Sequence, residues 1–257
     1  MRYIGFRTIT ILLLCILLPC QAAQVVKVGV AVFPPYIQKD PASGSDMLRV
    51  ELLDLMNAFQ DTYRFRPVVT GTIRRFKDFD LGKYDMSTYD NLAWGWEDRP
   101  VDASNVYLRG GEVYVALNLP GRSEDYFNNL AARQMVVMLG YHYGFAGFNA
   151  DPGYLRQHFQ ISFTNDNEAS LKLLLLGRGD VAVVSEAFLA DFLARQPEYR
   201  DRFLVSKKKD QAYAHTLIIR RGIHPTVNEL NQLLERMRKA GVLKPLWKKY
   251  GVETDAD

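Results

Sequence analysis

The spacing of apolar residues switches repeatedly between alternation and intervals of three or four residues, which predicts strands alternating with helices. Val25 to Ala31 alternates and is rich in Val, as expected for a strand. The next helix is predicted to begin with Ser45 as its N-cap. Its core-facing residues are expected to be Leu48, Leu52, Leu55, Met56 and Phe59. A strand over 65–69, a short helix over 72–82 and a strand over 84–88 complete a β-α-β-α-β run, which usually folds into an α/β sheet.

The second half of the chain repeats this pattern. The predicted strands are 134–139, 160–163, 180–184, 203–206 and 215–220, and the predicted helices are 152–159, 167–176, 187–195, 226–240 and 243–250. Asn165 or Asp166 caps the second of these helices, and Ser185 caps the third. Thr226 and Glu229 have the spacing of a capping box. The repeated pattern predicts two α/β units, with no low-complexity linker between them.

The first two dozen residues have the composition of a secretory signal peptide. Arg2 and Arg7 precede an apolar stretch over 9–18, and Pro19 ends it just before small residues. The stretch is much shorter than the roughly 20 residues that span a bilayer, so a membrane anchor is the weaker alternative. A lipid on Cys20 is weaker still, because Pro19 stands where lipidation sites usually carry a small residue. We predict a signal peptide over 1–23, cleaved after Ala22 or Ala23.

Composition and charge narrow the function classes. The chain has 257 residues, 48% of them hydrophobic and 24% charged, which is typical of a globular protein. A formal net charge of +3 without a long basic run argues against a nucleic-acid partner. Both cysteines, Cys15 and Cys20, lie in the signal peptide, so the mature protein has no disulfide. Metal-binding, Walker and nucleophile-elbow motifs are missing, and no metal or cofactor is expected.

Several short segments, in their order and spacing, resemble one known family. They are Phe33-Pro34-Pro35-Tyr36, Leu81-Gly82-Lys83-Tyr84-Asp85, Glu97-Asp98-Arg99, Leu176-Gly177-Arg178-Gly179-Asp180, the stretch 213–220 and Leu246-Trp247-Lys248-Lys249-Tyr250-Gly251. Together they make the mature chain similar to the family 3 extracellular solute-binding proteins, the periplasmic amino-acid-binding type of ABC transporters. The resemblance implies the α/β, two-lobed periplasmic binding protein fold (type II), with two sheets joined by two hinge strands. Lobe one would be 24–110 plus 213–257, and lobe two 111–212.

The resemblance also implies a function. A small polar solute would bind in the cleft between the lobes of a periplasmic monomer, which would deliver it to an inner-membrane ABC permease. Two alternatives use the same fold: a secreted enzyme similar to cyclohexadienyl dehydratase, and a ligand-sensing partner of a membrane receptor. For the enzyme, Glu186, Asp90 and His142 are the candidate acids and bases.

Arg99 stands where the family keeps an Arg that holds the ligand carboxylate, since a guanidinium can form two parallel hydrogen bonds. The alternative is a surface Arg in an acidic turn. Three residues earlier, Trp96 replaces the usual Ser or Thr. The rebuilt first-lobe loop then holds Tyr89, Asp90 and Trp94 as further ligand candidates, although either Trp could instead cover the lobe core.

Lobe two departs from the family pattern as well. Tyr141 and His142 stand where a Gly-Ser or Gly-Thr pair is usual, and Ser185 replaces the Asp that grips an amino group. Ser185 could be only a helix cap, and Glu186 could restore the amine contact. Tyr36, after two prolines, matches an aromatic residue that flanks the ligand in the family, and the alternative is a Tyr at the edge of the lobe core. These changes predict a ligand that is less zwitterionic than the usual amino acids, or one with a flat or cationic portion.

Overall fold

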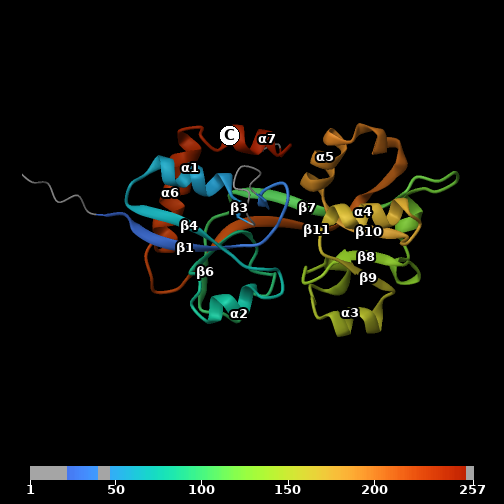
Figure 1. Cartoon of the computed structure of the whole chain (residues 1–257), viewed down its shortest axis with the longest axis horizontal. Helices are drawn as coiled ribbons and strands as arrows, with labels where there is room; N and C mark the ends of the chain where they lie inside the picture. Colours follow the sequence, from blue (N-terminus) through green and yellow to red (C-terminus); the bar gives the residue numbers. More distant parts are fainter. Residues whose placement is uncertain (1–21, 40–46, 253–257) are drawn as a thin grey trace, which may run out of the picture.

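The computed structural model describes residues 22–39 and 47–252 as two lobes side by side (Figure 1). The predicted signal peptide and the predicted N-cap Ser45 therefore lie outside the described residues, apart from Ala22 and Ala23. Within those two ranges, no helix combines the length and the apolar character that crossing a bilayer would require.

Lobe one holds the beginning and the end of the described chain. Its strands are β1 (Gln24–Val30), β4 (Tyr63–Val69), β5 (Met86–Asp90), β6 (Val101–Ala103) and the short pair β2 (Gln38–Lys39) and β3 (Leu48–Arg49). Its helices are α1 (Glu51–Phe59), α2 (Arg75–Asp80), α6 (Val227–Lys239) and α7 (Lys244–Lys249). β1 is the central strand, parallel to β4 on one side and to β5 on the other. Val26, Val28 and Val30 alternate into the core against α1 and α6.

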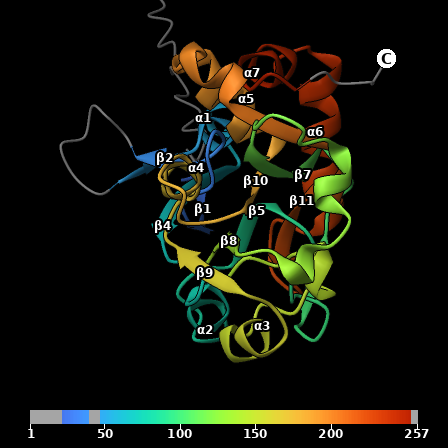
Figure 2. The ribbon, with the colours of Figure 1, turned by 90° about the vertical axis from the view of Figure 1, so that its right-hand side faces the viewer.

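Lobe two is built from the middle of the chain. Its strands are β8 (Met135–Met138), β9 (Ile161–Thr164) and β10 (Val181–Ser185), and its helices are α3 (Pro152–His158), α4 (Asn167–Leu175) and α5 (Glu186–Arg195). Short 3-10 turns are η1 (Glu124–Phe127), η2 (Leu130–Ala132), η3 (Gly144–Ala146) and η4 (Pro197–Arg202). Because strand side chains alternate, Ala182 and Val184 pack toward α4 and α5 while Val181 and Val183 pack on the other face. Figure 2 shows α5 and α3 on opposite sides of these strands.

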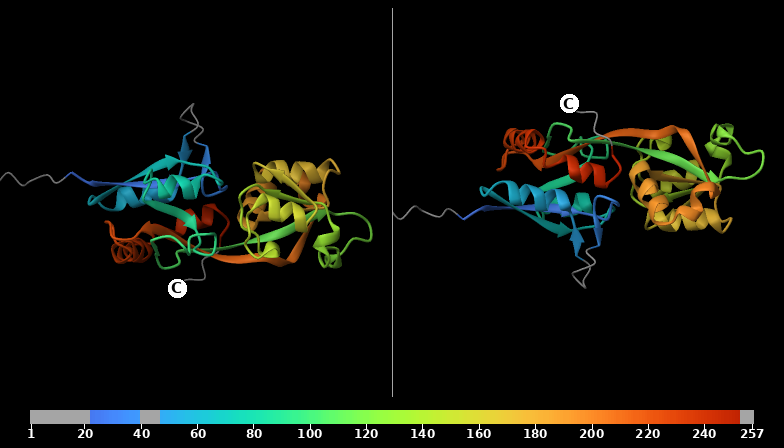
Figure 3. Two further views of the ribbon diagram at one scale, coloured as in Figure 1. Left: turned by 90° about the horizontal axis from the view of Figure 1, so that it is seen from below. Right: turned by 90° about the horizontal axis from the view of Figure 1, so that it is seen from above.

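Two long strands pass from one lobe to the other: β7 (Leu108–Leu117) and β11 (Phe203–Arg220). They pair with each other, with β5 and β6 in lobe one, and with β10 in lobe two. The sheet order is therefore continuous, β4-β1-β5-β11-β7-β10-β8-β9. Figure 3 shows both strands on one side of the gap between the lobes. The lobe boundaries predicted at 110/111 and 212/213 lie opposite each other in this ladder, where Gly111 pairs with Ala212 and Gly110 with Tyr213.

The alternation of strands and helices is confirmed, with three corrections. The first helix begins at Glu51, and Leu48 lies in β3, because the chain forms the short β2–β3 pair before the helix starts. The strands predicted over 203–206 and 215–220 are one strand, β11, whose register with β7 shifts between Val205 and Gln211. β7 itself was not predicted.

The predicted helix caps are confirmed where the structure describes them. The Asp166 side chain accepts from Ala169 N at 2.6 Å, and Ser185 accepts from Phe188 N at 3.2 Å. Thr226 and Glu229 form the reciprocal capping box of α6.

Candidate functional site

A cavity of about 70 Å³ lies between the lobes, next to the point where the paired strands β7 and β11 pass from one lobe to the other. Lobe one contributes Phe33, Tyr89 and Trp94 to its wall, lobe two contributes the segment 140–142, and the crossing strands contribute Glu112 and Gln211. A buried water needs roughly 10–15 Å³ of such space. The cavity therefore has room for about five waters, or for a small polar molecule.

The lobes touch each other around this cavity, so the structure is a closed form. Thr72 Oγ1 of lobe one donates to Leu139 O of lobe two at 3.1 Å. Phe33 and Tyr141 meet edge to face with ring centroids 6.0 Å apart. Gly140 has φ +83°, and a Cβ there would crowd Ile73 and Thr72 across the interface. A glycine at this position permits both the backbone conformation and the approach of the lobes.

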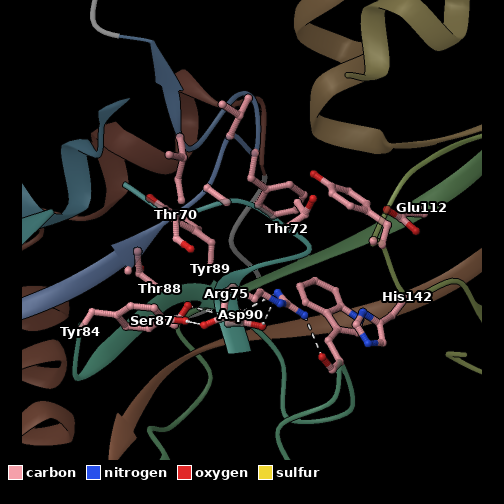
Figure 4. A pocket seen from close by; sticks show the side chains of 18 of the residues that line it. Thr70, Thr72, Arg75, Tyr84, Ser87, Thr88, Tyr89, Asp90, Glu112 and His142 are labelled. Carbon is pink, nitrogen blue, oxygen red and sulfur yellow. Dashed lines mark hydrogen bonds and ion pairs between the residues drawn. The ribbon is translucent and has the colours of Figure 1, made fainter. Parts of the chain in front are cut away.

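Arg75 and Asp90 form the charged part of the wall (Figure 4). Arg75 Nη1 lies 3.4 Å from Asp90 Oδ1, and Arg75 Nη2 donates to Trp94 O at 2.8 Å. Asp90 also accepts from Ser87 Oγ at 2.8 Å and from Asn91 N at 3.0 Å, so its carboxylate is fixed from several sides. Arg75 Nε is buried, and among the described residues it has no hydrogen-bond partner. Arg75 thus places a permanent cation with one unused N–H in the cavity wall, and a guanidinium is the side chain suited to an anionic group.

One amide joins both lobes and both crossing strands. Trp94 Nε1 of lobe one donates to Gln211 Oε1 on β11 at 3.0 Å. Gln211 Nε2 donates to Glu112 Oε2 on β7 at 2.8 Å and to His142 O of lobe two at 2.6 Å. An indole N–H can only donate, which fixes the orientation of the Gln211 amide. Rearrangement of either lobe would break at least one of these bonds.

We expect Trp94→Phe to weaken binding at this cavity about 3- to 10-fold, because it removes one buried hydrogen bond across the interface while keeping an aromatic ring. Isothermal titration with a compound that binds the wild-type protein measures this change. Trp96→Phe is the matched control, and an equal loss of affinity in both variants would contradict the prediction.

Burial changes the protonation of two groups in the wall. It raises the pKa of Glu112 to about 8, with the charge of Asp210 adding to the effect and the Gln211 hydrogen bond opposing it. Burial, followed by the charge of Arg75, lowers the pKa of His142 to about 4. At neutral pH Glu112 is therefore mostly protonated and His142 is neutral.

Tyr89 lines the cavity in an unusual backbone conformation. Its φ is +52°, rare for a bulky residue, and its N–H donates to the Tyr107 hydroxyl at 2.6 Å. Tyr36 does not line the cavity as predicted: it lies behind Tyr89, 1% exposed, with the two rings stacked at 4.7 Å. Phe33, three residues earlier, forms that part of the wall instead.

A fully buried histidine, His215 on β11, lies among these aromatic rings. Its ring centroid is 5.4 Å from that of Tyr36, 5.7 Å from that of Tyr89 and 5.9 Å from that of Trp94. Among the residues that the structure describes, neither ring nitrogen has a hydrogen-bond partner of ordinary geometry. Burial lowers the pKa of His215 to about 3, so the ring is neutral at physiological pH.

The structure does not bring Arg99 to the cavity. Arg99 Nε and Nη2 bind Asp80 at 3.1 and 3.2 Å, and Nη1 donates to Gly95 O at 2.8 Å. The guanidinium also stacks on Phe76 at 4.2 Å. These contacts occupy the guanidinium of Arg99 and place it outside the cavity, in keeping with the alternative that it is a surface Arg. Arg75 is the arginine that lines the cavity.

Trp94 and Trp96 face opposite ways, because Gly95 between them has φ +90° and turns the chain. Trp94 lines the cavity as predicted. Trp96 is fully buried against Phe76 and Phe79, as expected from the alternative in which it covers the lobe core.

Tyr141 and His142 of lobe two line the cavity, whereas Ser185 and Glu186 do not. Ser185 caps α5, as its alternative interpretation held. Glu186, at the start of α5, forms an ion pair with Lys209 at 2.8 Å, and 40% of its side chain is exposed.

Sequence reasoning missed Arg75, Glu112 and Gln211. Arg75 stands beside a second arginine on a short helix, where nothing in the sequence marks it as a cavity residue. Glu112 did carry a signal, since it is a single acid directly before the apolar stretch 113–117.

No family model and no curated protein sequence matches the chain. Many solved structures share its fold. The substrate-binding protein of an amino-acid ABC transporter is 18% identical, with a TM-score of 0.67 over 88% of this chain and 98% of that chain. A protein crystallised with L-arginine is 15% identical, with a TM-score of 0.68 over 89% of this chain and 91% of that chain.

An ancestral amino-acid-binding protein, described as a precursor of cyclohexadienyl dehydratase, is 20% identical, with a TM-score of 0.64 over 88% of this chain and 94% of that chain. At these identities the likeness establishes the fold. The two-lobed α/β fold expected from the resemblance to family 3 solute-binding proteins is confirmed.

Proposed function

We propose that the protein captures a small amino acid or a related organic acid in the cavity between its lobes. The observation that carries this proposal is Arg75, a permanent cation in the wall of a closed cavity, whose Nε has no hydrogen-bond partner in the part of the chain that the structure describes. An anionic group of the solute would complete its hydrogen bonding. Contacts with both lobes exist together only in the closed form, so a bound solute shifts the population toward closure.

The cellular role extends this proposal. The sequence of residues 1–23 supports secretion to the periplasm, and the fold is that of a transporter's substrate-binding protein. We infer that the closed, loaded monomer delivers its solute to an inner-membrane ABC permease. A ligand-sensing partner of a membrane receptor would bind the solute in the same way and differ in the protein that recognises the closed form. The transport role predicts that deletion of the gene abolishes uptake of the labelled solute, and unchanged uptake would contradict it.

Thermal unfolding of the mature protein with a panel of amino acids, organic acids and amines tests the proposed ligand class. A compound present at 100 times its Kd should raise the free energy of unfolding by about 2.7 kcal/mol, because it binds the folded state alone. We expect at least one amino acid or organic acid to do so. Stabilisation by amines alone, or by no member of the panel, would contradict the proposal.

A catalytic role is the second candidate, and one observation favours it. Glu112 is a buried, mostly protonated carboxyl in the cavity wall, as a general acid would be. Of the acids and bases expected from the sequence, Asp90 and His142 also line the cavity and Glu186 does not. Incubation with each stabilising compound, followed by chromatography, separates the two functions: binding predicts recovery of the unchanged compound, and catalysis predicts a product.

A further inference from the structure

We propose that Glu112 on the crossing strand β7 receives an ammonium group of the solute and gives its proton to solvent as that group binds. This rests on the proposed solute binding and names the second group that the cavity recognises. The O–H bond of the carboxyl breaks, the proton leaves to water, and the carboxylate remains paired with the ammonium. No oxidant or further reactant is involved.

The first argument is the unfilled bonding capacity of this carboxyl. Glu112 is 3% exposed and lines the cavity. Its side chain accepts one hydrogen bond, from the neutral Gln211 amide, and within residues 22–39 and 47–252 no cation forms an ion pair with it. An isolated carboxylate is costly to bury, so the group keeps its proton until a cation arrives.

The neighbouring acids are already satisfied. Asp210 accepts from the Tyr114 hydroxyl at 2.7 Å and from the N–H groups of Gly144 and Phe145 at 2.7 and 2.8 Å. Glu186 is paired with Lys209. Asp90 is held by the Ser87 hydroxyl and Arg75. Glu112 is thus the carboxyl of the cavity wall that a bound cation would stabilise most.

The groups around Glu112 set its response to pH. Asp210 raises the pKa of Glu112, and the Gln211 amide lowers it. Burial, with the carboxylate form of Glu112 adding to it, raises the pKa of four nearby tyrosines, so each of them stays protonated near neutrality: Tyr114, Tyr141, Tyr143 and Tyr213. The positive charge of Arg75 opposes this rise at Tyr141. Between pH 6 and 9 the protonation of Glu112 therefore changes while these tyrosines keep their protons.

The position of Glu112 in the sheet is the second argument. Glu112 pairs directly with Ser185 in the ladder between β7 and β10, so their side chains project from the same face. The resemblance places the carboxylate that grips an amino group at Ser185, where this chain has a helix cap. Glu112 supplies a carboxyl one strand away from that position. Figure 4 shows it on the side of the pocket where His142 lies, away from the Arg75–Asp90 pair.

The two ends of the cavity then recognise opposite charges. Arg75 offers a donor to an anion and Glu112 offers a carboxylate to a cation, with the Tyr141 ring between the two lobes and close to both groups. This corresponds to a zwitterion such as an amino acid. The less zwitterionic solute predicted from Ser185 and Trp96 was inferred from missing partners, and Glu112 and Arg75 supply such partners.

Matched triplets of compounds test the proposal: L-alanine with propionate and ethylamine, L-phenylalanine with phenylpropionate and phenylethylamine, and L-glutamine with its deaminated acid and decarboxylated amine. Titration calorimetry of the full mature chain at pH 7, in buffers of different ionisation enthalpy, gives both affinity and protons released. The variants are Glu112→Gln, which keeps the acceptor for Gln211, and Glu186→Gln, which removes a nearby acid outside the cavity.

We expect the best amino acid to bind at least tenfold more tightly than its deaminated acid and to release about 0.9 proton at pH 7, since a carboxyl of pKa about 8 is mostly protonated there. Glu112→Gln should abolish the release and the tenfold preference, and Glu186→Gln should keep both. Equal binding of amino acid and acid, without proton release, would overturn this inference and leave the proposed function intact. Binding of no triplet member would overturn both. If Glu112→Gln does not fold, proton release by the wild-type protein decides the question.

Discussion

Replacing Arg75 with Ala is expected to weaken binding of the most stabilising amino or organic acid by about 30- to 1,000-fold, equivalent to about 2 to 4 kcal/mol. The guanidinium is largely buried, with 16% of its side chain exposed, and its Nε has no protein partner. An anionic group bound there would lose a desolvated, charge-assisted contact. Titration calorimetry of the variant against the wild-type protein measures the loss.

Arg99→Ala is the matched control for this prediction. Arg99 is bound to Asp80 and Gly95 outside the cavity, so its removal should leave affinity unchanged within about threefold. Arg75→Lys should fall between the wild-type protein and Arg75→Ala, because it keeps the charge and loses the planar fork. Since Arg75 also holds Asp90 and Trp94, thermal unfolding must show that each variant is folded. Full affinity in a folded Arg75→Ala protein would refute the proposed anion site.

His215→Phe is expected to make the protein more resistant to acid. The pKa of His215 is lowered to about 3 in the folded state, against about 6.5 in the unfolded chain. Between these values the unfolded state binds more protons, so the stability due to the neutral ring is complete above pH 6.5 and is lost as the pH falls toward 3. Relative to the wild-type protein, the variant should gain about 2 kcal/mol of unfolding free energy between pH 8 and pH 5.

Denaturant unfolding at several pH values checks this difference. His142 acts in the same direction as His215 and Glu112 in the opposite one, but both remain in the two proteins and cancel in the comparison. A difference between His215→Phe and the wild-type protein that stays constant from pH 8 to pH 5 would show that His215 is not the buried neutral group described here.

The regular part of the fold was predictable because its helices and strands have strong periodic patterns and clear caps. β7 was missed for a physical reason: Arg109, Gly110, Gly111 and Glu112 interrupt the alternation of a strand. The interruption is needed, since a side chain at Gly110 would strike the ring of Tyr213 on β11. The alternation of apolar and polar residues in β11 is interrupted where the register of β11 with β7 shifts. The sequence is thus least regular where β7 and β11 pass from one lobe to the other.

The site was predictable only in part, because its geometry depends on turns that sequence spacing does not reveal. Trp94 and Trp96 look equivalent in the sequence, and the backbone of Gly95 sends one to the cavity and the other to the core. Arg99 has a matching position in the family pattern, but Asp80 on the preceding helix binds its guanidinium. Contacts between side chains that are separated in the sequence therefore determine which residues line the cavity.

The two crossing strands have a mechanical consequence for release of the solute. Residues 47–252 connect the lobes covalently through β7 and β11, so any opening of the lobes turns about these strands. The displacement of a group in such a rotation grows with its lever arm from the axis. Glu112 and Gln211 belong to these strands and should move less on opening than Trp94 and His142, which belong to the lobes. If Glu112 binds the ammonium group as proposed, an opened protein would release the cationic end of its solute last, and the return of a proton to Glu112 would complete unloading.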